Sequence, residues 1–169
     1  PTSGDGGTNY FTVRVTDSSG QNAFALLTVP VTVLTASGTW ISDNSGPWSD
    51  ANRWSSGLIA SGPGETADFS TINLTGNRIV TLDTSRKIGT LKFGDTSGSQ
   101  TWTIASSGGS TLTLDSASAA SPSIVVTNTA TLTAPVGGTN GFTKTGPGTL
   151  ILAANNPPSG TLYLDRGAD

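Results

Sequence analysis

Few side chains of this chain are able to do chemistry, and most of these are carboxylates. The 169 residues contain no histidine and no cysteine, which excludes serine–histidine–aspartate triads, cysteine nucleophiles and the usual zinc sites. A glycosidase pair needs two carboxylates, and the candidates here are Glu65 with Asp43, Asp50 or Asp68. Single aspartates among Ser, Gly and Asn are more typical of turns and caps. We therefore predict that the chain is not an enzyme.

Three of the four tryptophans, Trp40, Trp48 and Trp54, are close together in a segment rich in Ser, Asp, Asn and Gly. Exposed indole rings stack on sugars, so a carbohydrate-binding platform is one interpretation. The interpretation that we favour is an apolar plug that closes the first turn of the fold, because tryptophan brings a large area into a core.

Asp43 and Asp50 lie in the same segment, near Asn44 and Asn52. Oxygen ligands of this kind suit calcium, although their spacing is not that of an EF-hand. The alternative is a set of Asx turns in a long loop. We predict no cofactor, with calcium at Asp43 and Asp50 as the one candidate.

The composition indicates an all-β protein of low charge. Only 11% of the residues are charged, against a usual ~25%, and Gly and Pro are frequent while Thr and Val favour strands. With a net charge of -3 and no basic cluster larger than Arg86–Lys87, nucleic acid is not an expected partner. The longest apolar run, 23–34, is too short and too polar for membrane insertion.

Residues 10–16 and 24–34 are predicted to form a β-hairpin around a turn at 17–20. The first strand alternates apolar and polar residues, and Pro30 in the second indicates an edge or a bulge. Because a lone hairpin is marginal in water, we expect it to dock on something. The predicted assembly residues are Phe11, Val13, Val15, Phe24, Leu26, Val29, Val31 and Val33.

This hairpin resembles the closing strands of bacterial immunoglobulin-like or cadherin-like surface domains over residues 5–34. The remaining strands of such a domain are not in the sequence. The resemblance implies that the hairpin packs on the body of this chain or completes a sheet in a neighbouring molecule.

From residue 72 onward, short strands recur at intervals of roughly eight to twelve residues with Gly, Ser, Asn, Asp and Pro between them. The expected strands are 72–74, 79–82, 89–93, 101–104, 111–114, 123–127, 130–133, 141–144, 149–152 and 161–164. Their short length and Gly- and Asn-rich corners favour a parallel β-helix (β-solenoid), with a β-sandwich or jelly roll as the alternative. The predicted organisation is a hairpin at 1–35, a Trp-rich capping region at 36–70 and solenoid repeats at 71–169.

Several segments resemble the autotransporter-associated β-strand repeat proteins, which are large bacterial surface or secreted chains. The segments include WSDANRW and GFTKTGPGTLILAANNPPSGTLYL, and the likeness covers roughly 38–164. The repeat signature is matched at Gly141, Lys144, Gly146, Gly148, Thr149, Leu150, Leu152, Asn156 and Gly160. Pro157 and Pro158 depart from it, since the family often has an aromatic–threonine pair there. The resemblance implies a right-handed parallel β-helix in an extracellular region.

These observations lead to an expected function that is structural. We expect a non-catalytic module of a bacterial extracellular or cell-surface protein, which self-associates or joins neighbouring domains by end-to-end stacking or by β-strand donation into filaments. The open ends of a solenoid and the unfinished hairpin supply the strand edges. The alternative is a carbohydrate-binding module, with extracellular polysaccharide as partner.

Overall fold

The computed structural model describes residues 7–31, 34–154 and 162–164, and the chain divides into two compact units, Pro1–Leu34 and Thr35–Asp169. Apart from two short 3-10 helices, η1 (Ala51–Arg53) and η2 (Ser55–Gly57), the regular structure of the described residues is all strand. The prediction of an all-β chain without long helices is confirmed.

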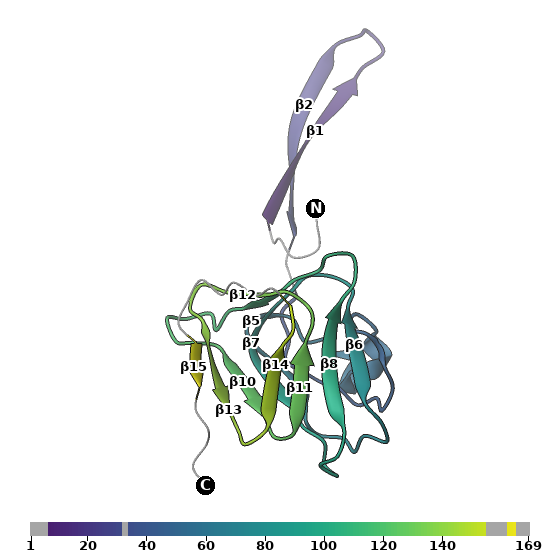
Figure 1. Cartoon of the computed structure of the whole chain (residues 1–169). Coiled ribbons are helices and arrows are strands. Elements are labelled where there is room, and N and C mark those ends of the chain that lie inside the picture. Colours follow the sequence, from purple (N-terminus) through teal and green to yellow (C-terminus); the bar gives the residue numbers. More distant parts are fainter. Residues whose placement is uncertain (1–6, 32–33, 155–161, 165–169) are drawn as a thin grey trace. The chain divides into compact units, whose positions relative to one another are not determined.

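The first unit is an antiparallel hairpin of β1 (Gly7–Thr16) and β2 (Asn22–Val31), which Figure 1 shows in purple. The register is regular, with Gly7 opposite Val31. At the turn, the carboxylate of Asp17 accepts hydrogen bonds from Ser19 and Gln21, which lower the pKa of Asp17. Pro30 pairs with Thr8 without a bulge, which a two-stranded sheet permits because both of its strands are edges.

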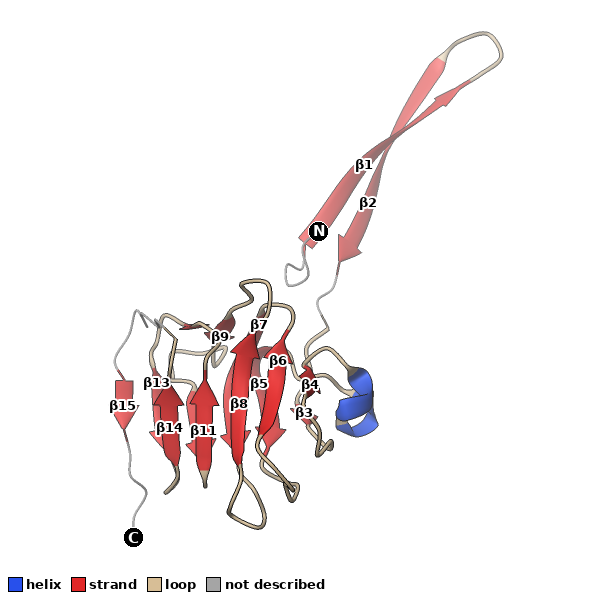
Figure 2. Ribbon diagram, turned by 45° about the vertical axis from the view of Figure 1, so that its right-hand side comes forward, coloured by secondary structure: helices blue, strands red, loops and turns tan. Residues whose placement is uncertain are grey.

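The second unit is a parallel β-solenoid, as predicted, and it has about four turns. Its first sheet contains β3 (Gly38–Thr39), β5 (Gly62–Phe69), β7 (Arg86–Phe93), β9 (Leu112–Leu114), β10 (Ser123–Val126), β12 (Val136–Gly137), β13 (Phe142–Thr145) and β15 (Leu162–Leu164). Its second sheet contains β4 (Gly46–Pro47), β6 (Arg78–Leu82), β8 (Thr101–Ser106), β11 (Thr129–Leu132) and β14 (Thr149–Leu152). Figure 2 shows the strands of the second sheet side by side in front of the first.

Every strand pairing in the solenoid is parallel, so each turn places equivalent side chains directly on those of the turn before. In the second sheet, Val80, Ile104 and Leu132 form one inward row, and all three are fully buried. In the first sheet, Phe69 lies on Phe93 with stacked rings 5.5 Å apart. One turn alone cannot bury its apolar side chains, and each turn therefore depends on its neighbours.

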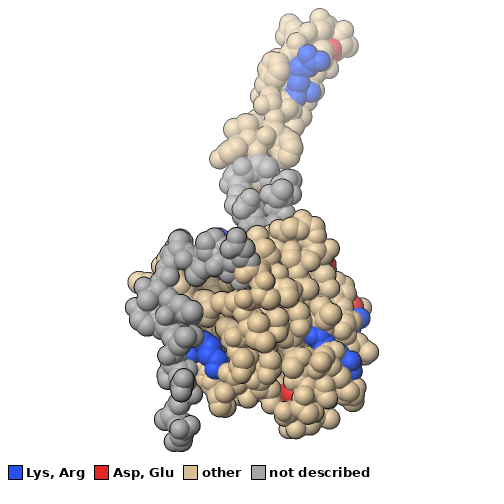
Figure 3. Space-filling view, viewed as in Figure 1, with Lys and Arg blue, Asp and Glu red and all other residues tan. Residues whose placement is uncertain are grey.

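Most outward positions of the second sheet hold hydroxyl groups in place of charges, and Ile79 and Ile151 are exceptions. Thr101, Thr129 and Thr149 occupy one row, and Thr103 and Thr131 another. Figure 3 shows only a few blue and red groups on the face in view, most of which is tan. β-Branched threonine suits a strand and hydrates without an ion, which explains how a chain with so few charges presents a polar surface.

Glycines stand at the corner between β13 and β14 because two turns of backbone approach closely there. A Cβ on Gly148 would lie 2.2 Å from the carbonyl oxygen of Asn128 in the preceding turn. Gly146 adopts a φ of 81° and lies close to the Val126 carbonyl oxygen. The ammonium group of Lys144 donates to the carbonyl oxygen of Gly146. The spacing K-x-G-x-G thus belongs to a corner of the coil.

We expect Gly148→Ala to lower the free energy of unfolding by about 2 kcal/mol or more, because the added methyl group meets backbone that cannot move independently. Gly137→Ala is the matched control, since a Cβ there meets nothing within 4 Å. Chemical denaturation of both variants measures the difference. Equal stability of the two variants would contradict this explanation of the corner.

Most predicted strands are present, and the differences lie at the corners. Residues 72–74 are not a strand, because the segment is a turn in which the Leu74 amide donates to the side chain of Asp95. The structure adds β12 and the two-residue strands β3 and β4, and it begins β5 at Gly62. The prediction at residue 161 lies outside the described residues.

Candidate functional site

The three clustered tryptophans lie inside the first turn of the coil. Trp40 and Trp48 are fully buried and Trp54 is 1% exposed. The ring centroid of Trp54 lies 5.3 Å from that of Trp40 and 5.3 Å from that of Trp48. All three rings contact Phe69, which continues the aromatic packing to Phe93 and thus into the next turn.

Each indole N–H is also satisfied within the fold. Trp40 donates to the carbonyl oxygen of Ser42, Trp48 to that of Ala60 and Trp54 to that of Trp48, at 2.7, 2.9 and 2.7 Å. A sugar platform requires exposed ring faces, and these side chains offer none. Their arrangement is that of the apolar plug, because the rings pack against one another and against the core.

The two aspartates proposed for calcium have different partners. Asp43 accepts from the guanidinium of Arg78 at 2.8 Å and from the amide and hydroxyl of Thr75. The bond from Arg78, followed by those from Thr75, lowers the pKa of Asp43 to about 2. This contact joins the loop of the first turn to the corner before β6.

Asp50 forms the N-cap of η1, where it accepts from the Asn52 amide, and it pairs with Arg53 at 3.0 Å. The Arg53 guanidinium lies 5.9 Å from the Trp40 ring centroid. Among the described residues, no three His, Cys, Asp or Glu side chains gather closely enough to hold a metal ion. Asp50 therefore fits the turn and capping interpretation, whereas Asp43 forms a long-range contact with Thr75 and Arg78 in place of an Asx turn.

The other carboxylates considered for acid–base work are also engaged. Glu65 accepts from the Ser37 hydroxyl at 2.6 Å. Asp68 accepts from the amide and hydroxyl of Ser70, and its carboxylate lies 3.8 Å from the ammonium group of Lys92. The two carboxylates are thus held by different neighbours.

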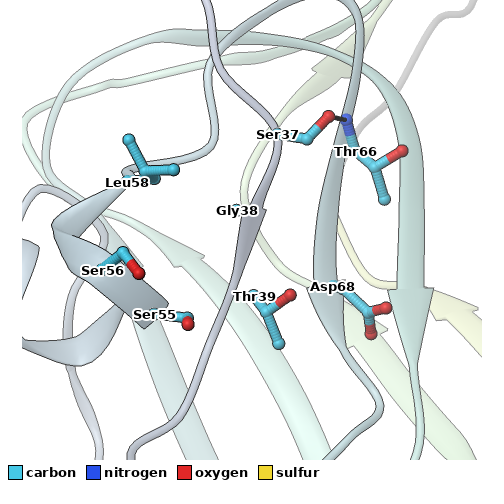
Figure 4. Close-up of a pocket in the computed structure, with 8 residues that line it drawn as sticks. All are labelled: Ser37, Gly38, Thr39, Ser55, Ser56, Leu58, Thr66 and Asp68. Atoms are coloured by element: carbon cyan, nitrogen blue, oxygen red, sulfur yellow. Dashed lines mark hydrogen bonds between the residues drawn. The ribbon is translucent and has the colours of Figure 1, made fainter.

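A shallow pocket of about 240 Å³ lies beside β3, where η2 and β5 approach it (Figure 4). Its lining consists of Ser37, Gly38, Thr39, Ser55, Ser56, Leu58, Thr66 and Asp68. The Thr66 amide donates to the Ser37 hydroxyl at 2.9 Å. Hydroxyls and a single carboxylate supply hydrogen bonds but no nucleophile with an adjacent base, so this pocket does not indicate a reaction.

The hairpin presents one face that is apolar from Phe11 to Val15 and from Ala23 to Val29. Residues directly opposite each other in an antiparallel pair point to the same side, and the register pairs Phe11 with Leu27 and Val13 with Ala25. We call this side the apolar hairpin face, and its described members are Phe11, Val13, Val15, Ala23, Ala25, Leu27 and Val29. Phe11 is 55% exposed and Leu27 is 51% exposed.

The predicted assembly residues are divided between the two faces of the hairpin. Phe24 lies opposite Arg14 and Leu26 opposite Thr12, so both point away from the apolar hairpin face. Sequence analysis missed Leu27, because the pair Leu26–Leu27 does not show which residue follows the alternation. The side chain of Val31 and all of Val33 lie outside the described residues.

The C-terminal end of the solenoid is open on its second sheet. Leu152 continues the row of Ile104 and Leu132, which are fully buried, yet Leu152 is 36% exposed. Ile151 beside it is 44% exposed. Within the described residues β14 pairs with β11 and with no strand on its other side, so an inward apolar row ends without a covering turn.

The N-terminal end, in contrast, is closed. The isolated antiparallel bridge between Trp40 and Trp54, where the Ile41 amide donates to the Arg53 carbonyl oxygen, covers the edge next to β3. On the other sheet, the Trp48 amide donates to the Thr81 carbonyl oxygen. Backbone groups alternate sides along a strand, so Pro47 lies with its missing N–H at the free edge of β4. Both are recognised ways of protecting the edge of a sheet.

Comparison with protein-family models, with curated proteins and with solved structures gives no match to this chain. Within the described part of the chain, no helix is long and apolar enough to cross a membrane.

Proposed function

We propose that this chain is a non-catalytic structural module of a bacterial extracellular or cell-surface protein, whose copies or neighbouring domains join through exposed β-strand edges. The observation that supports it most is the presence of two unfinished surfaces in one chain: the apolar hairpin face and the open edge of β14. The resemblance to autotransporter-associated repeats and the low charge support the extracellular assignment.

The exposed apolar area of the hairpin is the first argument. Phe11, Val15 and Leu27 are each more than half exposed, and burying such side chains is worth roughly 1.5–3 kcal/mol each. A two-stranded hairpin gains little stability alone. A partner that covers this face therefore supplies the core that the hairpin lacks.

The closed N-terminal end supports one of the two routes of assembly that we consider. Stacking one solenoid on another requires an open edge at both ends, and the Trp40–Trp54 bridge and Pro47 protect the N-terminal end. Donation of a strand requires one open edge and a strand to fill it. We accordingly favour strand donation, in which two different surfaces meet and propagate into a filament.

Burial of the tryptophans removes the feature on which the carbohydrate-binding alternative depended. In our proposal, extracellular polysaccharide is a partner of the surface protein as a whole, and we assign no binding site for it on this chain. The lack of His and Cys and the engagement of Asp43, Asp50, Glu65 and Asp68 support a non-catalytic role.

We expect the 169-residue chain to self-associate as its concentration rises, and Val13→Lys to weaken this association by roughly a hundredfold, because a charge would enter an apolar interface. Sedimentation velocity and negative-stain electron microscopy measure the change.

The control for this experiment is Thr28→Lys, which adds the same charge to the opposite face of the hairpin, on β2, and should leave association nearly intact. A monomer at all accessible concentrations would overturn the proposal, as would equal behaviour of the two variants.

A further inference from the structure

The two free edges of the hairpin differ in their backbone N–H donors, because the edge of β2 lacks the donor of Pro30. The Asp17 amide donates to the Gln21 carbonyl oxygen across the hairpin. Backbone groups alternate sides along an antiparallel strand, so the amides of Phe11 and Val13 also point toward β2, and those of Thr12 and Arg14 point to the free edge of β1. The same alternation places the missing N–H of Pro30 at the free edge of β2. The edge of β1 is therefore the better donor.

The free edge of β14 has a defined set of backbone groups. The Thr149 amide donates to the Asn128 carbonyl oxygen and the Ala153 amide to that of Leu132, both in the direction of β11. The amides and carbonyls of Leu150 and Leu152 consequently point away from β11, to the free edge. The inward apolar row continues through the same two leucines.

Only one orientation joins these edges with apolar side chains inward. In an antiparallel pair, a residue whose N–H and C=O point toward the partner strand lies opposite a residue whose own N–H and C=O point back, and their side chains share one side of the sheet. Leu150 and Leu152 would therefore lie opposite Thr12 and Arg14. In a parallel pair, a residue whose N–H and C=O point toward the partner strand lies opposite a residue whose N–H and C=O point away from it. Leu150 and Leu152 then lie opposite Phe11 and Val13. The parallel orientation is also that of the pairings between the named strands of the coil.

Among the described residues, β14 has a strand neighbour on one side, β11, and none on the other. β1 has the alternation of apolar and polar residues that a strand at this position requires, with Phe11, Val13 and Val15 on one face.

We propose that β1 of a second copy of this chain pairs in parallel with β14, with Phe11 beside Leu150 and Val13 beside Leu152. The Thr12 amide then donates to the Leu150 carbonyl oxygen, and the Thr12 side chain lies outward beside Ile151. β2 follows β1 as an antiparallel strand and ends the sheet with the edge that contains Pro30. This proposal rests on the proposed function and identifies the two edges that meet.

The first test removes a single hydrogen-bond donor. Thr12→Pro deletes the amide at the free edge of β1, and we expect it to weaken self-association of the full chain at least roughly tenfold. Thr28→Pro is the matched control, because Thr28 lies directly opposite Tyr10 and its amide points to the free edge of β2. Circular dichroism establishes that both variants retain their strands.

The second test uses cysteines introduced into a chain that has none. Thr12→Cys and Ile151→Cys molecules, each made separately and then mixed, should form a disulfide-linked heterodimer under mild oxidation, since adjacent paired residues have the spacing that a disulfide needs. A mixture of Thr12→Cys with Thr131→Cys should not, because Thr131 lies one strand further into the sheet.

The outcomes separate this proposal from the proposed function. Heterodimer formation together with a selective loss of association in Thr12→Pro supports it. Association that persists in Thr12→Pro without the heterodimer overturns the pairing and leaves the structural role intact, whereas a chain that stays monomeric overturns both. A disulfide formed within single molecules of the double variant Thr12→Cys/Ile151→Cys would also overturn the proposal.

Discussion

Replacing Phe69 by alanine should lower the free energy of unfolding of the solenoid by about 4 kcal/mol, the upper part of the range for a buried aromatic side chain. Phe69 is fully buried, and its ring contacts those of Trp40, Trp48, Trp54, Phe93 and Trp102. It is thus the residue that connects the tryptophan plug to the stacked interior. Its removal leaves a cavity that five rigid rings cannot close.

Thermal and chemical denaturation measure this effect, with an expected fall in Tm of roughly 10–15 °C. Ile79→Ala is the control, because Ile79 points outward, is 47% exposed and should change stability by about 0.5 kcal/mol or less. A loss below about 1 kcal/mol in Phe69→Ala would contradict the view that the plug closes the first turn.

Replacing Asp95 by asparagine should cost about 3 kcal/mol at neutral pH, because one buried carboxylate organises a whole corner of the coil. Its oxygens accept from the amides of Leu74, Ser97, Ser99 and Gln100 and from the Ser97 hydroxyl. Asp95 is 7% exposed. Asparagine keeps the size of the side chain but presents N–H groups where acceptors are required.

The Asp95 carboxylate also predicts that the free energy of unfolding depends on pH. Burial of Asp95 acts to raise its pKa, but the hydrogen bonds from Leu74, Gln100 and Ser97 outweigh burial and hold the pKa well below the usual range. A carboxyl whose pKa is lower in the folded than in the unfolded state stabilises the fold above the unfolded value of about 3.9, and this contribution is lost as the pH falls toward the folded value.

The difference in unfolding free energy between the natural chain and Asp95→Asn should therefore be constant above about pH 5 and shrink between pH 4 and pH 2. Urea denaturation at a series of pH values measures it. Asp43 and Asp17 also have lowered pKa values, but they are present in both proteins and cancel in the difference. A difference that does not change with pH would show that the carboxylate of Asp95 is not the stabilising group.

The sequence allowed the coil to be predicted because its strands alternate and its corners contain glycine. The expected strands at 79–82, 101–104 and 149–152 coincide with β6, β8 and β14 to within two residues at either end. The prediction of a strand at 72–74 was wrong, because these residues form a corner in which the Leu74 amide donates a hydrogen bond to the Asp95 carboxylate. Hydrogen bonds between turns are not visible in local alternation.

The candidate site was less predictable for a similar reason. The pattern around Phe11 showed one apolar face, but which residues of β2 share that face depends on the hairpin register, and this placed Leu27 there in place of Leu26. The sequence also identified the three clustered tryptophans, but it did not show whether their rings are buried or exposed. Their burial follows from contacts with Phe69, and local alternation does not reveal these contacts.

Amide hydrogen exchange of the 169-residue chain at increasing protein concentration tests most directly whether the free edges of β1 and β14 meet. We predict that the amides of Leu150, Leu152 and Thr12 become protected together as the chain assembles, while that of Ile151, which points toward β11, is protected throughout. Assembly in which the Leu150 and Leu152 amides exchange as fast as in the dilute protein would contradict this account.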